Sequence, residues 1–330
     1  MLKLDHVSAR YNMLSSYVNA VEDVSVTIQD GEIFGIAGES GCGKSTLLKI
    51  MYDLVEYPLE ICAGTVELCA KRVDGSVDHY GPNEIRTRRW KDISYVPQGA
   101  MHVLNPVAKI DVQFYDAVSQ KRCHGARAQL RNEIVAYLRS LDLPETVMDS
   151  YPHQLSGGMR QRVMIALATF SRVGLILADE PTTALDVVVQ RGILTMLSKV
   201  QRSTGNSIVI VSHDMGVHYQ IAHRLGIMYA GKLIEVGPTD EIFEHPAHPY
   251  TQMLIRALPR VGDIAQKEGI PGSPPSLREP ITGCRFAPRC PRATARCRVE
   301  DPAVCNVSSR HTAACHLLCN VTEGSEQVHA

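Results

Sequence analysis

Short apolar runs that alternate with segments of helical periodicity predict the regular elements of this chain. Residues 32–37 form an apolar run typical of a buried parallel strand, and apolar residues recur at helical spacing between 47 and 51. Residues from about 99 to 170 are mostly helical in pattern. The segments "GLILAD", "SIVIVS" and "LGIMYA", within 171–235, again predict buried strands. This alternation predicts an α/β fold with a mixed, mostly parallel sheet covered by helices.

A change in composition after residue 236 predicts a second part of the chain. "GIPGSPPSLREP" is a proline-rich linker, and six of the ten cysteines lie beyond it, between Cys284 and Cys319. A length of 330 residues with 45% hydrophobic content fits two domains, or one domain plus an extension. We therefore expect one domain over 1–235, with a helical subdomain at about 99–170, and a small cysteine-rich extension over 236–330.

Net charge and hydropathy argue against two classes of protein. The formal net charge is −1, which gives no overall positive field for nucleic acid. The apolar stretch "VMIALATFSRVGLILA" is interrupted by Ser171 and Arg172, so it predicts a buried helix followed by a buried strand and not a membrane span. The first ten residues lack the apolar core of a signal peptide. We expect a cytosolic protein that reaches a membrane only through partners.

The stretch "GESGCGKST", residues 38–46, has the spacing of a P-loop between a strand and a helix. Its glycines let backbone N–H groups approach phosphate oxygens, and the helix N-terminus adds partial positive charge. In this motif the lysine reaches the β- and γ-phosphates, and the serine gives its hydroxyl to Mg²⁺. The residues expected to contact ATP here are Gly38, Ser40, Gly41, Cys42, Gly43, Lys44, Ser45 and Thr46.

Cys42 occupies an unconstrained position of this loop. A thiol at a helix N-terminus among inward-facing amides often has a lowered pKa. We therefore expect Cys42 to react with thiol reagents more readily than Cys62 or Cys69, and to be protected by ATP.

An acidic element, "LILADEPTTALD", occupies residues 175–186. A buried strand that ends in an aspartate, here Asp179, is the usual Mg²⁺-side partner of a P-loop. Glu180 follows directly and is placed to polarise an attacking water. These two carboxylates therefore predict the hydrolytic side of the nucleotide site.

A second anion site is predicted by "LSGGMRQR", residues 155–162. Its serine and two glycines precede a helix that runs from Met159 to about Phe170, and a helix start of this composition suits an anion. One chain with two phosphate-binding helix starts indicates a two-part nucleotide site.

In these motifs the chain resembles the ATP-binding cassette (ABC) family over residues 1 to about 235. "GESGCGKST" is similar to its Walker A motif, "LILADE" to its Walker B motif and "LSGGMRQR" to its signature. Gln98 in "YVPQ" matches its Q-loop, Asp186 in "ALD" its D-loop, and His213 in "IVIVSHD" its switch histidine. The resemblance implies an ABC-type P-loop NTPase, with a mixed sheet core and a helical subdomain, that acts as an ATPase.

The resemblance also implies roles for individual residues. Two cassettes pair head to tail, and each ATP would receive Ser156 and Gly158 of the signature from one subunit and the remaining motifs from the other. Tyr11 is the match for the aromatic that stacks on adenine, with Tyr17 as the alternative. Asp186 would lie at the dimer interface near the nucleotide. The implied catalytic residues are Lys44, Gln98, Glu180 and His213, and the implied Mg²⁺ ligands are Ser45, Gln98 and Asp179.

The tail is similar to the C-terminal extension of ATPases from dipeptide and oligopeptide importers. The matching pieces are "HPYT" with "LIRALP", then "GCRFAPRCPRATARC" and "ACHL". The resemblance implies a second, different ATPase subunit, two transmembrane permease subunits and an extracytoplasmic solute-binding protein. It places the chain at the cytoplasmic face of the cell membrane, with no nucleic acid partner.

Two alternatives to peptide import stay open at this stage. Relatives with this tail also carry nickel or oligosaccharides, so the tail does not fix the solute. A role with nucleic acid is the second alternative. The chain would then be a soluble ABC ATPase that acts on nucleic acid or ribosomes, or its tail would be a metal-dependent nucleic-acid module, for which residues 284–298 carry five arginines and no acidic residue.

Four cysteines of the tail have the separations x5, x6 and x17, namely Cys284, Cys290, Cys297 and Cys315. Four thiolates can close a tetrahedral zinc site or hold an iron–sulfur cluster. The first two separations are wider than the spacing of paired cysteines in structural zinc sites. The resemblance associates such tails with iron–sulfur centres. We therefore expect a [4Fe–4S] cluster, with zinc as the alternative. Cys305 and Cys319 lie outside the pattern, and His311 and His316 are expected to be ordinary polar residues.

Overall fold

The computed structural model describes the chain except residues 15, 72–75, 100–102, 120–126, 259–268 and 320–330. The described residues form two compact units, each built from several stretches of the sequence. The first unit comprises Met1–Leu2, Thr27–Ile33 and Glu67–Ser212, and the second comprises Lys3–Val26, Phe34–Val66 and His213–Ala330. Each unit is described in turn.

The first unit contains a parallel sheet in the order β8–β7–β6. Its strands are β6 (Ile93–Val96), β7 (Leu175–Asp179) and β8 (Ser207–Ser212). Every residue of β7 and β8 is buried, as the continuous apolar runs predict for strands covered on both faces. In the same unit, residues 68–71 of β4 pair with β5 (Val77–Tyr80) in antiparallel register.

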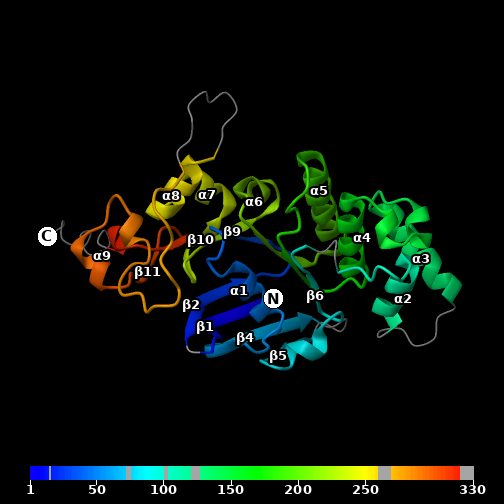
Figure 1. Ribbon diagram of the computed structural model, residues 1–330, viewed down its shortest axis with the longest axis horizontal. Coiled ribbons are helices and arrows are strands. Elements are labelled where there is room, and N and C mark those ends of the chain that lie inside the picture. The colour runs from blue at the N-terminus through cyan, green and yellow to red at the C-terminus, as the bar shows by residue number, and fades with distance from the viewer. Residues whose placement is uncertain (15, 72–75, 100–102, 120–126, 259–268, 320–330) are drawn as a thin grey trace. The chain divides into compact units, whose positions relative to one another are not determined.

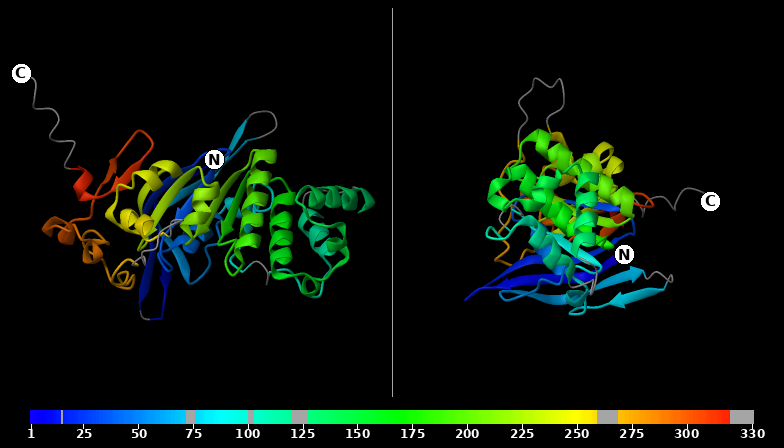
Figure 2. Two further views of the ribbon diagram at one scale, coloured as in Figure 1. Left: turned by 90° about the horizontal axis from the view of Figure 1, so that it is seen from above. Right: turned by 90° about the vertical axis from the view of Figure 1, so that its right-hand side faces the viewer.

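Helices make up most of the first unit between residues 110 and 204. They are α2 (Ile110–Ser119), α3 (Arg127–Ser140), α4 (Gly157–Phe170) and α5 (Val187–Thr204). Helices α4 and α5 run side by side in Figures 1 and 2, and they contact each other. The predicted helical region and the predicted passage from a buried helix into a buried strand are therefore present, as α2 to α4 and as α4 followed by β7.

The second unit contains strands in the order β11–β12–β10–β9–β3. The parallel pair joins β3 (Ile33–Ala37) to β9 (Arg224–Tyr229), and β9 turns back into β10 (Lys232–Pro238) as an antiparallel hairpin. A separate antiparallel sheet has the order β2–β1–β4, with β1 at Leu2–Asn12, β2 at Tyr17–Ile28 and β4 at Leu59–Lys71. Helices α1 (Lys44–Met51), α6 (Met215–Ile221), α7 (Thr239–Glu244) and α8 (Pro249–Arg256) complete this part.

The cysteine-rich tail packs into the second unit as part of its fold. Its elements are α9 (Ala295–Val299), β11 (Val304–Asn306), β12 (Thr312–Ala314) and α10 (His316–Cys319). Strand β12 pairs with β10 in antiparallel register, so that Glu235 faces Ala313. The boundary expected at residue 235 thus falls inside β10. The orange and red tail lies beside the yellow α7 and α8 in Figure 1.

An aromatic cluster anchors the tail in the core of the second unit. Phe286 of the tail, Tyr229 of β9 and Tyr250 of α8 are each at most 1% exposed. Their ring centroids lie 4.7 to 5.4 Å apart in tilted or edge-to-face arrangements. Burial of one such side chain contributes about 1.5–3 kcal/mol, which ties the tail to the strand and helix it covers.

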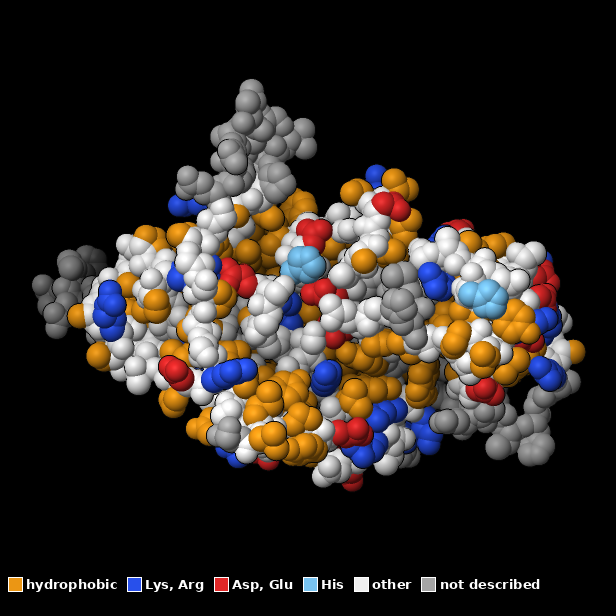
Figure 3. All heavy atoms as spheres, viewed as in Figure 1, with side chains coloured by type: hydrophobic (Ala, Val, Ile, Leu, Met, Phe, Trp, Pro, Cys, Tyr) orange, Lys and Arg blue, Asp and Glu red, His pale blue; other side chains and the backbone are white. Residues whose placement is uncertain are grey.

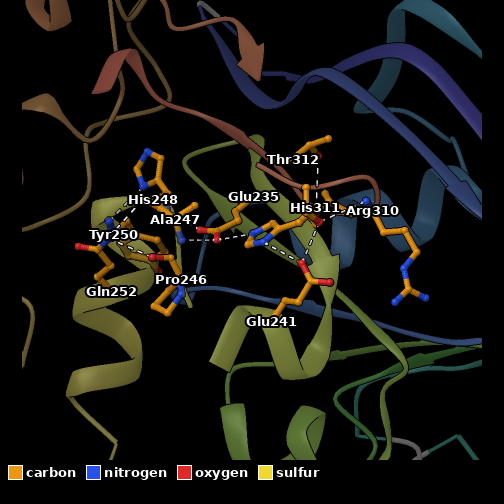
Figure 4. A network of polar contacts seen from close by, with 12 residues as sticks. Glu235, Glu241, Pro246, Ala247, His248, Tyr250, Gln252, Arg310, His311 and Thr312 are labelled. Atoms are coloured by element: carbon orange, nitrogen blue, oxygen red, sulfur yellow. Dashed lines mark hydrogen bonds and ion pairs between the residues drawn. The ribbon is translucent and has the colours of Figure 1, made fainter. Parts of the chain in front are cut away.

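A buried polar network joins the tail to β10 and α8 (Figure 4). The Glu235 carboxylate accepts hydrogen bonds from the backbone N–H groups of Ala247 and His248, at 2.7 and 2.9 Å. Its Oε1 also lies 2.8 Å from Nε2 of His311, whose Nδ1 lies 3.5 Å from Oε2 of Glu241. His311 and Glu235 are almost fully buried. His311 is therefore a buried structural residue, held by polar contacts with two carboxylates.

No helix within the part of the chain that the structure describes is both long enough and apolar enough to span a bilayer.

Candidate functional site

The P-loop lies in the second unit, between β3 and α1. Its backbone needs glycine at two positions. A Cβ at Gly38 would lie 2.1 Å from the carbonyl oxygen of Met228, and a Cβ at Gly43 would lie 2.2 Å from that of Ala20. Gly43 also has φ 106°, a left-handed conformation that disfavours other residues. The loop therefore packs closely against the backbone of Met228 and Ala20 before helix α1 begins.

Lys44 begins helix α1 and points back into the loop. Its buried ammonium donates hydrogen bonds to the carbonyl oxygens of Gly38 and Glu39, each at 2.8 Å. The side chain is thus held inside the same loop whose backbone amides would surround a phosphate. Ser45 is partly buried next to it, and the hydroxyl of Thr46 lies 3.1 Å from that of Tyr11.

The structure contradicts the expectation that Cys42 is a reactive thiol. Cys42 is 5% exposed, and burial raises the pKa of its thiol even though the Lys44 ammonium, 3.7 Å from Sγ, opposes that effect. The helix start does lie where the sequence predicts it, but the apolar surroundings outweigh its field. Cys62, which is exposed, is the more accessible thiol.

Two tyrosines remain candidates for stacking on adenine. Tyr11 at the end of β1 is tied through its hydroxyl to the P-loop helix, whereas the ring of Tyr17 lies beneath the guanidinium of Arg10 at 5.2 Å. Hydrophobic side chains gather on the surface over these strands in Figure 3. Leu14, in the turn between β1 and β2, is fully exposed, and Tyr57, just before β4, is 81% exposed. The apolar surface near the β1–β2 turn suits a flat base, and Tyr11 has the direct link to the phosphate-binding element.

The His-Pro-Tyr stretch of the tail has a structural explanation that the sequence pattern alone does not reveal. His248 is the N-cap of α8, and its Nδ1 accepts a hydrogen bond from the backbone N–H of Tyr250 at 3.0 Å. Pro249 occupies the first helical position, where its missing N–H costs nothing. The cap directs Tyr250 inward. The Tyr250 hydroxyl accepts a hydrogen bond from the backbone N–H of Glu39 in the P-loop, at 3.2 Å.

The acidic motif lies in the first unit, at the carboxyl end of β7. Asp179 is 2% exposed, and its Oδ2 accepts a hydrogen bond from the hydroxyl of Tyr95 at 3.0 Å. Glu180 adopts φ 45°, an uncommon conformation that turns its side chain off the strand. Its Oε2 accepts hydrogen bonds from Thr183 Oγ1 at 2.7 Å and from Gln98 Nε2 at 3.3 Å. Within this unit the structure therefore brings Gln98 and Glu180 together, beside Asp179.

The signature begins α4 in the first unit, two residues earlier than Met159. Ser156 is its N-cap and accepts a hydrogen bond from the Met159 N–H at 3.3 Å. A Cβ at Gly158 would lie 2.6 Å from Cγ1 of Val189 on α5, so a side chain there would push the two helices apart. Asp186 caps α5 by accepting from the Val189 N–H at 2.9 Å. Ser156 is exposed.

His213 begins the segment of the second unit that follows β8. Its side chain is exposed, and the next residue, Asp214, is the N-cap of α6. The position at a strand end with an open side chain fits a residue that contacts a ligand.

The four tail cysteines named in the sequence pattern gather in the second unit. The pKa of Cys284 is raised to about 11, mainly by burial and to a smaller extent by the neighbouring Cys297 and Cys315. Burial likewise raises the pKa of Cys290 and of Cys315, again with added effects from the other thiols. A coordinating metal ion would oppose these shifts, because it deprotonates the thiols that bind it.

Backbone N–H groups point at these sulfurs. The N–H groups of Phe286 and Ala287 donate to Cys284, that of Arg292 to Cys290 and that of Leu317 to Cys315. Cys297 Sγ lies 3.5 Å from the Thr294 N–H nitrogen and 3.3 Å from its Oγ1. Such donors stabilise thiolates around a metal centre. Cys305 is disulfide-bonded and stands apart from this group.

Two parts of the chain match known protein families. Residues 21–183 match the family described as "ABC transporter", and residues 234–297 match "Oligopeptide/dipeptide transporter, C-terminal region". Among solved structures, the post-hydrolysis dimer of the ATP-binding cassette MJ0796 bound to ADP and Pi is 29% identical. It covers 72% of this chain and 99% of its own, with a TM-score of 0.62.

Relatives match along nearly the whole length. The dipeptide transport ATP-binding protein DppD of Escherichia coli (strain K12) is 35% identical over 96% of both chains. DppD of Bacillus subtilis (strain 168) is 37% identical over 96% of this chain and 94% of that relative. A putative peptide import ATP-binding protein of Brucella ovis is 39% identical over 90% of each. The chain therefore belongs to the ABC transporter ATPases, in the branch of the dipeptide and oligopeptide transport ATP-binding proteins.

Proposed function

We propose that this chain is the ATP-hydrolysing subunit of a membrane transporter that imports dipeptides or oligopeptides. The observation that carries the proposal is the tail, which matches the oligopeptide/dipeptide region and reaches the P-loop through Tyr250. The chain would pair with a second, different ATPase subunit and with two permease subunits, and an extracytoplasmic protein would deliver the solute. It would lie at the cytoplasmic face of the membrane, held there by the permease. Residues 1–235 would form the cassette and 236–330 the extension.

The nucleotide roles follow from the chemistry of the described side chains. The P-loop amides and Lys44 would bind the phosphates, and Tyr11 would stack on adenine. Mg²⁺ would supply charge neutralisation on the phosphate oxygens, held by Ser45, Gln98 and Asp179. The donor set fits this ion, because it consists of a hydroxyl, an amide oxygen and a carboxylate.

Water activation is proposed for Glu180. Thr183 and Gln98 hold its carboxylate in one orientation, which is what a base needs to take a proton from an in-line water. His213 would contact the γ-phosphate. Ser156 and Gly158 would meet the ATP of the partner cassette, and Asp186 would lie beside that interface.

The four tail cysteines are proposed to hold a [4Fe–4S] cluster in preference to zinc. With Zn–S bonds of about 2.3 Å, four sulfurs in a zinc site lie about 3.8 Å apart. Of the residues that the structure describes, only Glu67, Cys69 and His79 form a group of three whose ligand atoms all lie within 4.8 Å of one another. No three of the four tail sulfurs lie within that distance of one another, which supports the larger cluster over zinc. Wider spacing favours a cluster in which each thiolate binds a different iron.

Transport is tested by reconstitution in proteoliposomes. The full chain would be co-purified with permease and second ATPase subunits encoded beside it, and uptake of a labelled dipeptide measured with Lys44→Ala as the inactive control. ATP-dependent peptide uptake that the Lys44 variant lacks is the expected result. Uptake of nickel or an oligosaccharide without peptide uptake would redirect the proposal to those solutes. Salt-dependent binding to RNA or DNA without permease co-purification would overturn it.

The cluster is tested by anaerobic purification. We expect a brown protein with broad absorption near ~400 nm and about four irons per chain. Replacement of Cys290 and Cys315 by serine should remove the colour. A colourless wild-type protein with one zinc per chain would contradict the iron assignment.

A further inference from the structure

A salt bridge connects the cysteine-rich tail to the P-loop across 250 residues of sequence. Nη1 of Arg289 lies 2.8 Å from Oε2 of Glu39, and Nη2 lies 3.0 Å from Oε1. The pair is bidentate, with both N–H···O bonds parallel, which is the strongest geometry for an arginine and a carboxylate. The Arg289 side chain is 4% exposed and that of Glu39 25%. The contact is therefore shielded from solvent on the arginine side.

Further hydrogen bonds hold the Arg289 guanidinium in place. In addition to the two bonds to Glu39, Nη1 donates to the hydroxyl of Tyr229, at 3.2 Å. Nη2 donates to the carbonyl oxygen of Ile270 at 3.1 Å, and Nε to that of Pro271 at 2.8 Å. All five N–H donors of a guanidinium are thus in use. These hydrogen bonds hold the guanidinium in one position, and the guanidinium in turn fixes the position of the Glu39 carboxylate.

Glu39 in turn touches the phosphate-binding apparatus through its backbone. Its carbonyl oxygen accepts a hydrogen bond from Lys44 Nζ, and its N–H donates to the hydroxyl of Tyr250. Side chain and N–H are therefore both held by residues that follow the cassette in sequence, while the carbonyl oxygen orients the P-loop lysine. A shift of Glu39 would move both the loop backbone and the Lys44 ammonium.

The charge of Glu39 makes the arginine necessary for a second reason. An unpaired carboxylate at the second position of a P-loop would repel the phosphates of a nucleotide at short range. The Arg289 guanidinium compensates that charge. The same side chain therefore fixes the loop and removes an unfavourable field from the anion site.

We propose that Arg289 is a positioning residue of the nucleotide site, which lets the tail set the affinity of the P-loop for ATP through Glu39. The inference rests on the proposed function only in that the P-loop binds ATP. Arg289 directly precedes Cys290, so the segment that carries the cysteine cluster also carries this clamp. ATP affinity thereby depends on the docked tail, although no residue of the tail belongs to the six ABC motifs.

The test uses the full chain and measures the Kd of a fluorescent ATP analogue for Arg289→Gln, Arg289→Lys and Glu39→Gln. We expect Arg289→Gln to weaken binding about tenfold, which corresponds to about 1.4 kcal/mol, and to raise KM for ATP with little change in kcat in the assembled transporter. The Kd of Arg289→Lys should lie between those of the wild type and Arg289→Gln, since lysine keeps the positive charge but cannot form the bidentate pair. The double variant Arg289→Gln with Glu39→Gln should recover most of the lost affinity, because it also removes the repelling charge.

Arg296→Gln is the matched control. Arg296 also directly precedes a tail cysteine and pairs with a carboxylate, but this is the carboxylate of Glu300 and not of a P-loop residue, and both side chains are about half exposed. It should leave the Kd unchanged. Wild-type affinity in Arg289→Gln would overturn the proposal, as would a loss of affinity that the double variant does not relieve. Failure of the wild-type chain itself to bind ATP would instead refute the proposed function.

Discussion

His248 should make the stability of the second unit depend on pH. Burial lowers the pKa of this histidine from 6.5 to about 4, although Glu235 opposes the shift. The helix cap explains what protonation would disrupt, because Nδ1 accepts the Tyr250 N–H and loses that bond when it binds a proton. The perturbation that tests this is His248→Asn, which keeps a good N-cap but removes the titration.

The sign and size follow from the two pKa values. Between pH 6.5 and about 4 the unfolded chain binds a proton at residue 248 and the folded chain does not, so stability falls as the pH falls through this range. Above pH 6.5 the contribution is fully present. The linkage predicts that the free energy of unfolding falls by about 2 kcal/mol between pH 7.5 and pH 5.

The assay is urea unfolding of the full chain at several pH values, supported by hydrogen exchange of the amides of α8. Between pH 7.5 and pH 5 the free energy of unfolding should fall by about 2 kcal/mol more in the wild type than in His248→Asn. His245→Asn serves as the control, because His245 lies three residues away but is exposed. Equal pH slopes for wild type and His248→Asn would refute the reasoning, since the buried neutral ring would then have no energetic effect.

Three further predictions concern the nucleotide site and the tail. Glu180→Gln should retain ATP binding and lower turnover by about 10²–10⁴-fold, measured as phosphate release in the assembled transporter; unchanged turnover would exclude it as the base. Cys62 should react with a thiol reagent faster than Cys42, as quantified by mass spectrometry, and preferential labelling of Cys42 would show that the loop opens. Phe286→Ala should destabilise the second unit by about 3–5 kcal/mol, read from urea midpoints, whereas wild-type stability would mean that the tail does not share this core.

The local motifs were predictable from sequence because each carries its own geometry. A glycine-rich loop between an apolar run and a helical repeat predicts a strand, a turn and a helix. Strand β3 lies within one residue of its predicted bounds, and α1 contains the apolar repeat at 47–51. The same holds for Ser156, whose residue type and position define a helix cap. Asp179 ends β7 and Glu180 follows it, as the apolar run and the two acidic residues after it predict.

Contacts between distant segments were not predictable. Nothing in the sequence around Glu39 indicates that its carboxylate meets Arg289, because the pair exists only when the tail has docked. The behaviour of Cys42 was predicted wrongly for a related reason. A helix start lowers a thiol pKa, but the degree of burial that raises it is a property of the whole unit and not of the motif. His311 illustrates the same limit, since its partner Glu235 lies on another strand.

The pairing of β12 with β10 has a consequence for shortened forms of the chain. A strand at the border of a sheet offers unpaired N–H and C=O groups to any other strand, which promotes self-association. Among the described residues of the second unit, β12 covers this edge of β10, and the three-residue β11 lies beyond it. A chain that ends at the natural-looking boundary near residue 235, or anywhere before 304, leaves the edge of β10 bare along with the buried Glu235. Preparations of the cassette without its tail are therefore expected to aggregate, and poor solubility in such preparations should not be attributed to a defect of the nucleotide-binding fold.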